Sequence, residues 1–168
     1  MRKVFLLSLL LVVLSLVIPW LVVTLSPAEE PAAQPLPSVT ASAAVAPDSE
    51  TAITALSGGA LVETTMADWL PGVVAAEMPA SFAPEALRAQ AVAARTYILQ
   101  RVRGGAANHP EAGVCDQYTC CCARKDDAAL REQWGADYAH NMARIRQAVT
   151  DTDGQYLTYG GQLIRAVF

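Results

Sequence analysis

An unbroken apolar run marks the N-terminal part of the chain. Val4 to Leu25 comprises 22 residues without a charged side chain, most of them Leu, Val or Ile. A helix of about 20 apolar residues is long enough to cross the hydrocarbon of a membrane. Residues 1–25 are therefore predicted to form a transmembrane anchor. The alternative is a cleaved signal peptide, whose apolar core is usually shorter, at about 7–15 residues.

The charges around this run predict its orientation. Arg2 and Lys3 precede it, and the next Lys or Arg is Arg88. The positive-inside rule then predicts a single-pass cell-membrane protein with a cytoplasmic N-terminus and an extracytoplasmic remainder. Residues 26–50 are rich in Pro and Ala and lack aromatic residues, so they are expected to form an extended linker. A folded domain is expected over residues 51–168.

Alternating apolar and polar positions predict two β-hairpins in this domain. Residues 51–56 and 60–64 flank Ser57-Gly58-Gly59, and residues 155–159 and 162–168 flank Gly160-Gly161. Glycine pairs between β-prone runs are typical of tight hairpin turns. The chain ends inside the last predicted strand, which leads us to expect a domain that is truncated at its C-terminus.

Three helices are predicted between the hairpins. The first follows the N-cap Thr65 and ends before Pro79. The second runs from Pro84 to Gly104, since Pro suits the first helical position and Gly the C-terminal end. The third covers about residues 136–150, and we expect it to pack on the sheet. The fold class is therefore α+β: an N-terminal transmembrane helix, then β-hairpins and about three helices.

The net charge of the chain argues against two classes of binding protein. The 12 Lys and Arg and 16 Asp and Glu give a net charge of -4. Nucleic-acid binding depends on neutralising phosphates with basic side chains, so a nucleic-acid partner is not expected. A polybasic module that binds membrane surfaces is disfavoured for the same reason.

Glu77 is the candidate catalytic residue, because it is the only charge between Asp68 and Glu85. A carboxyl among apolar side chains loses solvation of its charged form and tends to remain protonated, as a general acid must be. The alternative is a glutamate at a helix end that faces water or pairs with an arginine. Arg88 and Arg95, seven residues apart on one helix face, are candidates for that pairing, for binding an anionic substrate, or for a solvated surface.

A cysteine cluster is the candidate metal site. All four cysteines lie between Cys115 and Cys122, and His109 precedes them by six residues. Thiolates and imidazole are good zinc ligands, whereas an exported protein also favours disulfides. Structural zinc, a disulfide from Cys115 to a later cysteine, and free thiols all remain open. The aromatic residues at helical positions, including Tyr97 and Trp134, are more typical of core packing than of sugar stacking.

Two sequence blocks resemble a known family. The stretch WLPGVVAAEMP at 69–79, followed by EALRAQAVAARTY at 85–97, is similar to the stage II sporulation protein D family, which includes amidase enhancer proteins. The resemblance extends from about Ile53 to Phe168. A single anchor followed by a proline-rich linker is also a feature of this family.

The resemblance implies a lytic transglycosylase that cleaves peptidoglycan between N-acetylmuramic acid (MurNAc) and N-acetylglucosamine (GlcNAc) during forespore engulfment. Glu77 matches the catalytic acid/base of the family, and the products have 1,6-anhydro ends. No cofactor is implied for catalysis. The alternative is a noncatalytic wall-binding or amidase-enhancer module. The implied partners are glycan strands, a peptidoglycan amidase and a membrane scaffold protein.

The resemblance also implies a zinc site, with departures from the family pattern. Relatives use a cysteine cluster preceded by a histidine, which His109 and Cys115 match. A later family histidine is replaced here by Thr119 or Cys120. We therefore take His109, Cys115, Cys120 and Cys121 as the candidate ligands. The resemblance further implies that a His-Ser-x-Ser-Gly-Gly segment, which forms part of the substrate groove, follows Ala166-Val167-Phe168 in relatives, and this sequence ends before it.

Overall fold

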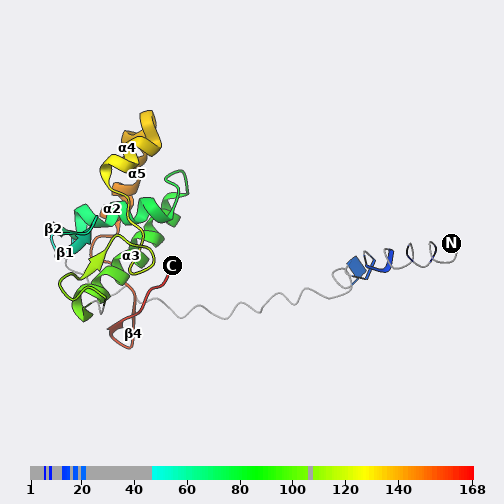
Figure 1. Ribbon diagram of the computed structural model, residues 1–168, viewed down its shortest axis with the longest axis horizontal. Coiled ribbons are helices and arrows are strands. Elements are labelled where there is room, and N and C mark those ends of the chain that lie inside the picture. Colours follow the sequence, from blue (N-terminus) through cyan, green and yellow to red (C-terminus); the bar gives the residue numbers. More distant parts are fainter. Residues whose placement is uncertain are drawn as a thin grey trace. The chain divides into compact units, whose positions relative to one another are not determined.

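The computed structural model describes residues 6, 8, 13–15, 17–18, 20–21, 47–105 and 108–168 (Figure 1). The chain divides into two units, residues 1–42 and 43–168. Within the described residues, no helix is both long and apolar enough to cross a membrane. Most of the predicted anchor, residues 1–25, and of the linker, residues 26–50, lies outside the described residues. Both therefore stay predictions.

The first predicted hairpin is confirmed. Strands β1 (Ala52–Ser57) and β2 (Ala60–Thr65) pair antiparallel. Gly58 and Gly59 join them with φ angles of 57° and 84°, a backbone that favours glycine and matches the twist of a hairpin. A third strand, β3 (Val114–Cys115), pairs parallel to β1 and gives the sheet order β2-β1-β3. The sequence did not predict β3, because two residues carry no detectable alternation.

The first two predicted helices are also confirmed. Helix α2 (Met66–Glu77) begins at Thr65, whose Oγ1 accepts a hydrogen bond from the Asp68 N–H at 3.3 Å. Helix α3 (Pro84–Gly104) begins with Pro84 and is followed by Gly105 at φ 72°. The two helices therefore begin, and α3 also ends, where the capping residues predicted.

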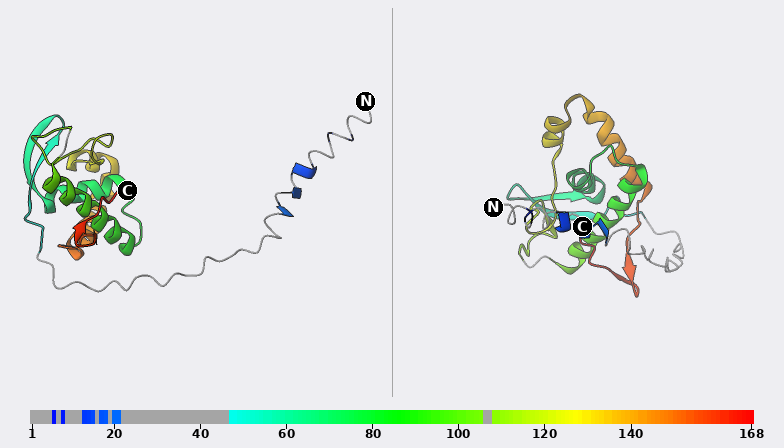
Figure 2. Two further views of the ribbon diagram at one scale, coloured as in Figure 1. Left: turned by 90° about the horizontal axis from the view of Figure 1, so that it is seen from below. Right: turned by 90° about the vertical axis from the view of Figure 1, so that its right-hand side faces the viewer.

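The third helical region differs from the prediction. It contains α4 (Asp127–Trp134), a 3₁₀ turn η1 (Gly135–Asp137) and α5 (Tyr138–Asp151). The expectation of about three helices missed α4, because Leu130 is its only buried residue and leaves no apolar period. Helix α5 packs on α2 and α3 rather than on the sheet. Figure 2 shows α4 and the start of α5 projecting from the rest of the domain.

The second hairpin forms, but it is shorter than predicted. Strands β4 (Thr158–Tyr159) and β5 (Gln162–Leu163) pair around Gly160 and Gly161, with φ angles of 56° and 78°. The described part of the domain is thus α+β, with a three-stranded sheet, a two-stranded hairpin and four α-helices.

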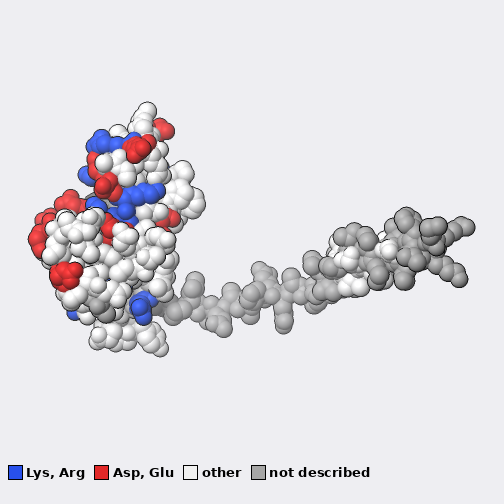
Figure 3. All heavy atoms as spheres, in the orientation of Figure 1, with Lys and Arg blue, Asp and Glu red and all other residues white. Residues whose placement is uncertain are grey.

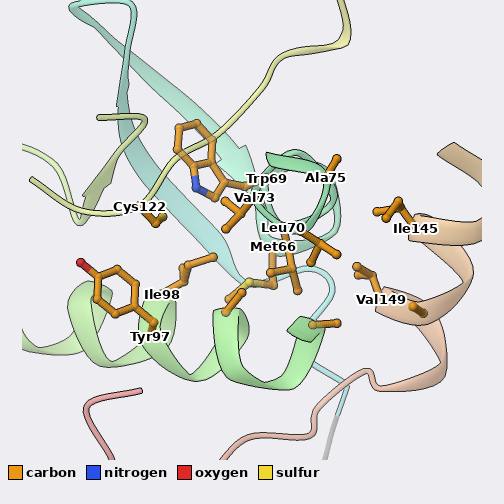
Figure 4. Close-up of a cluster of buried hydrophobic side chains, with 14 of the residues drawn as sticks. Met66, Trp69, Leu70, Val73, Ala75, Tyr97, Ile98, Cys122, Ile145 and Val149 are labelled. Atoms are coloured by element: carbon orange, nitrogen blue, oxygen red, sulfur yellow. The ribbon is translucent and has the colours of Figure 1, made fainter. Parts of the chain in front are cut away.

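Helix α2 lies at the centre of the hydrophobic core. Met66, Trp69, Leu70, Val73 and Val74 are at most 1% exposed, and α2 packs on α3, α5 and β2. Figure 4 shows Met66, Leu70 and Val73 of this helix between Ile98 from α3 and Ile145 from α5. Burial of large apolar side chains contributes about 1.5–3 kcal/mol each, so α2 contributes a large share of the stability of the domain.

A close backbone contact fastens the loop after β3 to α2. The Lys125 N–H donates to the Gly72 carbonyl at 3.2 Å. A Cβ on Gly72 would lie 2.5 Å from the Lys125 carbonyl oxygen and 3.1 Å from Arg124 Cγ. Gly72 is therefore required for the loop to approach this closely.

We predict that Gly72→Ala lowers the free energy of unfolding by about 1–3 kcal/mol, the usual cost of overpacking. The matched control is Gly104→Ala, because a Cβ there meets only Gln100 Nε2 at 3.9 Å. Urea unfolding curves of both variants provide the measurement. Equal stability of the two variants would show that the loop does not pack on α2 as described.

Candidate functional site

Glu77 lies at the point where α2 reaches the surface. It is the last residue of the helix, and the Met78 N–H closes the turn by donating to the Val74 carbonyl at 3.0 Å. Val73 and Val74 are fully buried, whereas Glu77 itself is exposed. The expectation of an apolar-enclosed carboxyl is therefore wrong for this structure, because the last turn of α2 emerges from the core. The helix-end alternative describes its position better.

Neither candidate arginine accompanies Glu77. Arg95 is 1% exposed and lies 3.1 Å from Asp48, while its guanidinium donates to the Val149 and Thr152 carbonyls at 2.8 and 2.6 Å. It joins α3 to the end of α5 and to the segment before β1. Burial lowers the pKa of Arg95 and raises that of Asp48.

Arg88 is held in a different ion pair. Its guanidinium lies 2.7 Å from Asp151 and 3.4 Å from Glu85, and it lines a cavity between α3 and α5. Neither Arg88 nor Arg95 lines a described cavity that contains Glu77. A role for them in substrate binding stays a prediction.

Two cavities meet at Glu77. The first has a volume of about 250 Å³ and the second about 280 Å³. In the first, Glu77 is joined by Tyr97, Tyr118, Cys121, Cys122, Ala123 and residues 166–168. In the second, it is joined by residues 75–76, 78–81, Lys125, Gln133, Trp134 and Asn141. Glu77 is the only Asp or Glu that lines either cavity in the described part of the chain.

The first cavity has an aromatic and apolar wall. The Tyr97 hydroxyl donates to the Cys121 carbonyl at 2.9 Å and accepts from Arg101 Nε at 3.0 Å. The Phe168 ring packs edge-on to Tyr97, with centroids 6.0 Å apart. Burial raises the pKa of Tyr97, so its phenol stays neutral. These contacts hold the Tyr97 ring in place beside Glu77.

The second cavity is more polar and carries a cation. Lys125 Nζ donates to Gln133 Oε1 at 2.6 Å. Trp134 is half-buried and lies against Tyr138, with ring centroids 6.3 Å apart. The sequence did not single out Lys125, although it is the only lysine after Lys3.

The four candidate metal ligands come together in the structure. Their ligand atoms, the Sγ atoms of Cys115, Cys120 and Cys121 and a ring nitrogen of His109, all lie within 4.8 Å of one another. His109 Nε2 is 3.1 Å from Cys121 Sγ. His109 Nδ1 lies 2.9 Å from the Ala112 carbonyl. That carbonyl fixes the proton on Nδ1 and directs the Nε2 lone pair into the cluster.

This donor set fits a structural zinc ion. Three thiolates and one imidazole are a common set for closed tetrahedral sites, whose ligand atoms lie about 3.8 Å apart. The Cys120 and Cys121 sulfurs, 4.0 Å apart, and the His109 and Cys121 ligand atoms, 3.1 Å apart, lie on either side of that spacing, so only small shifts are needed to reach it. Burial raises the pKa of Cys115 to about 12, while the hydrogen bond from Asn108 lowers that of Cys120. All four cysteines of the chain lie in its described part, and no two of them are joined by a disulfide there.

Cys122 is separate from this cluster. It is 5% exposed, and burial raises its pKa to about 12. Figure 4 shows its side chain among the core residues near Trp69 and Val73. It also lines the first cavity beside Glu77. Neighbouring Cys121 is both a candidate ligand and part of the same cavity wall, so the cluster shapes that wall.

Comparisons with known proteins place the chain in a family. Residues 57–159 match the family described as Stage II sporulation protein (SpoIID). The chain is 42% identical over 102 residues to a Stage II sporulation protein D from Bacillus amyloliquefaciens. It is 43% identical over 102 residues to one from Bacillus subtilis (strain 168). Each match covers 60% of this chain and 30% of the relative's length. Because the family match covers more than half of the chain, this protein belongs to the SpoIID family of stage II sporulation proteins, which supports a sporulation-related function.

Proposed function

We propose that this chain acts on the cell wall as a peptidoglycan lytic transglycosylase, cleaving glycan strands between MurNAc and GlcNAc during sporulation. The observation that carries the proposal is the position of Glu77 between two cavities. A residue that protonates a glycosidic oxygen needs one sugar on each side of it, and cavities of about 250 and 280 Å³ flank the carboxylate.

One carboxylate is sufficient for this chemistry. Protonated Glu77 donates its proton to the glycosidic oxygen as the bond from that oxygen to C1 breaks. The carboxylate then accepts the proton of the muramic acid 6-hydroxyl, whose oxygen bonds to C1 and closes a 1,6-anhydro ring. No water attacks, so the second carboxylate of ordinary glycosidases is not required. That agrees with Glu77 being the only Asp or Glu that lines either cavity in the described residues.

Glu77 is exposed in the free protein, and we propose that bound substrate covers its side chain. Sugars in both cavities would displace water from around the Glu77 side chain at the moment of proton transfer. The free protein therefore does not need a buried acid. As part of the same proposal, the protein is anchored in the membrane and its folded domain is extracytoplasmic. Its partners there are a peptidoglycan amidase and a membrane scaffold protein.

The exposure of Glu77 also favours a second candidate, a noncatalytic module that binds the wall and enhances an amidase. In that case the two cavities bind glycan without cleaving it. Substitution of Glu77 separates the two candidates.

We predict that the full-length protein forms 1,6-anhydro ends on peptide-free glycan strands and that Glu77→Gln lowers the rate by about 10²–10⁴-fold, the usual contribution of a general acid. Mass spectrometry of the products measures this. Glu85→Gln is the control, since Glu85 is exposed and lines neither cavity. Equal products from Glu77→Gln and its parent would refute the proposal. Amidase stimulation without any cleavage would favour the second candidate.

We further propose that His109, Cys115, Cys120 and Cys121 hold a structural zinc ion that takes no part in the reaction. When bound, the ion would cross-link β3 to the loop that forms the wall of the first cavity. The spacing of the ligand atoms and the orientation of His109 support this assignment.

The purified chain should contain about one zinc per molecule by elemental analysis, and Cys115→Ser or Cys121→Ser should lose it. The matched control is Cys122→Ser, which removes a cysteine outside the cluster and should retain zinc. Ligand binding at 100 times Kd stabilises a fold by about 2.7 kcal/mol, so chelation should lower the Tm. A metal-free protein whose intact mass shows a disulfide would instead establish the disulfide alternative.

A further inference from the structure

The two cavities at Glu77 differ in charge. Besides Glu77, the second cavity contains one charged side chain, Lys125, together with the neutral polar side chains of Ser81, Gln133 and Asn141. The first cavity contains no lysine or arginine. In a glycan of two alternating sugars, one of them anionic, the anionic sugar would therefore favour the cavity that contains Lys125. The neutral sugar would then occupy the other cavity.

Lys125 is held in place without its charge being neutralised. Its backbone N–H donates to the Gly72 carbonyl, and its Nζ donates to the amide oxygen of Gln133. Among the ion pairs of the described residues, none involves Lys125. Its side chain is only half-exposed. A partly desolvated ammonium whose partner is a neutral amide has donors left for an anion.

The two sugars of peptidoglycan differ in one anionic group. MurNAc carries a lactyl ether that GlcNAc lacks, and this lactyl carboxylate is free only where no stem peptide is attached. A carboxylate is the anion that a single ammonium binds well. Trp134 lines the same cavity and offers an apolar face for the sugar ring.

We propose that Lys125 is a specificity-determining residue that binds the free lactyl carboxylate of the MurNAc on one side of Glu77. The GlcNAc across the scissile bond then occupies the cavity walled by Tyr97 and Tyr118. This inference rests on the proposed function, and it assigns a sugar to each cavity. Lys125 thereby selects glycan from which the peptides have been removed.

Binding without turnover provides the test. The full chain with Glu77→Gln is titrated with peptide-free glycan strands and with the same strands after their lactyl carboxylates are converted to methylamides. Loss of a charge-assisted hydrogen bond weakens binding by roughly 10–100-fold. Lys125→Met should weaken binding to the untreated strands by this factor and leave binding to the methylamide strands unchanged. Lys125→Arg should restore most of the difference.

Arg131→Gln is the matched control, because it removes a cation from α4 that lines neither cavity. The inference is overturned if Lys125→Met binds both kinds of strand as the Arg131→Gln control does, or loses affinity for both equally. Circular dichroism checks that each variant is folded. If Lys125→Met does not fold, the parent and Lys125→Arg still provide the test. Both should bind the untreated strands more tightly than the methylamide strands, and equal affinity of the parent for the two kinds of strand would overturn the inference.

Failure of the proposed function gives a different result. Cleavage is measured separately, with Glu77 present, on the untreated strands. Absence of 1,6-anhydro ends with discriminating binding would refute the transglycosylase but support the role of Lys125. Formation of 1,6-anhydro ends with indiscriminate binding would refute the role of Lys125 alone.

Discussion

The burial of α2 is the constraint on which the rest of the domain depends. Its apolar residues fill the space between the sheet, α3 and α5, so the axis of the helix is fixed on several sides. The last turn of the helix leaves the core, and Glu77 is the exposed residue at that point. The packed helix therefore fixes the backbone position of Glu77, which helps a group that must meet a particular glycosidic oxygen.

The loop after β3 turns this helix end into a site. It carries Cys120 and Cys121 toward His109, Cys122 into the core, and Lys125 into the second cavity. Gly72 lets the loop lie directly on α2, so the candidate metal cluster and the two cavities share one structural support. Figure 3 shows basic and acidic side chains mixed in the upper part of the visible face, while most of its lower part carries no charge. Recognition of a glycan is therefore expected to depend on the local charge of Lys125 rather than on a large basic surface.

Local signals predicted most of the elements, and non-local packing explains what they missed. Glycine pairs fixed both hairpin turns, and Thr65, Pro84 and Gly105 marked helix ends. Helix α4 has almost no buried face, and β3 exists only because it pairs with β1. Burial of Arg95 with Asp48, 47 residues before it in sequence, could not be inferred from the spacing of Arg88 and Arg95. The four ligand residues were predictable because they are close in sequence, whereas the exposure of Glu77 and the place of Lys125 depend on how the loop packs.

The structure of the Glu77→Gln chain with a bound peptide-free tetrasaccharide of MurNAc and GlcNAc tests the central claim most directly. The account predicts sugar rings in both cavities, with the glycosidic oxygen between them about 2.6–3.2 Å from the side chain of residue 77. A tetrasaccharide bound in only one cavity, or bound away from the end of α2, would contradict it.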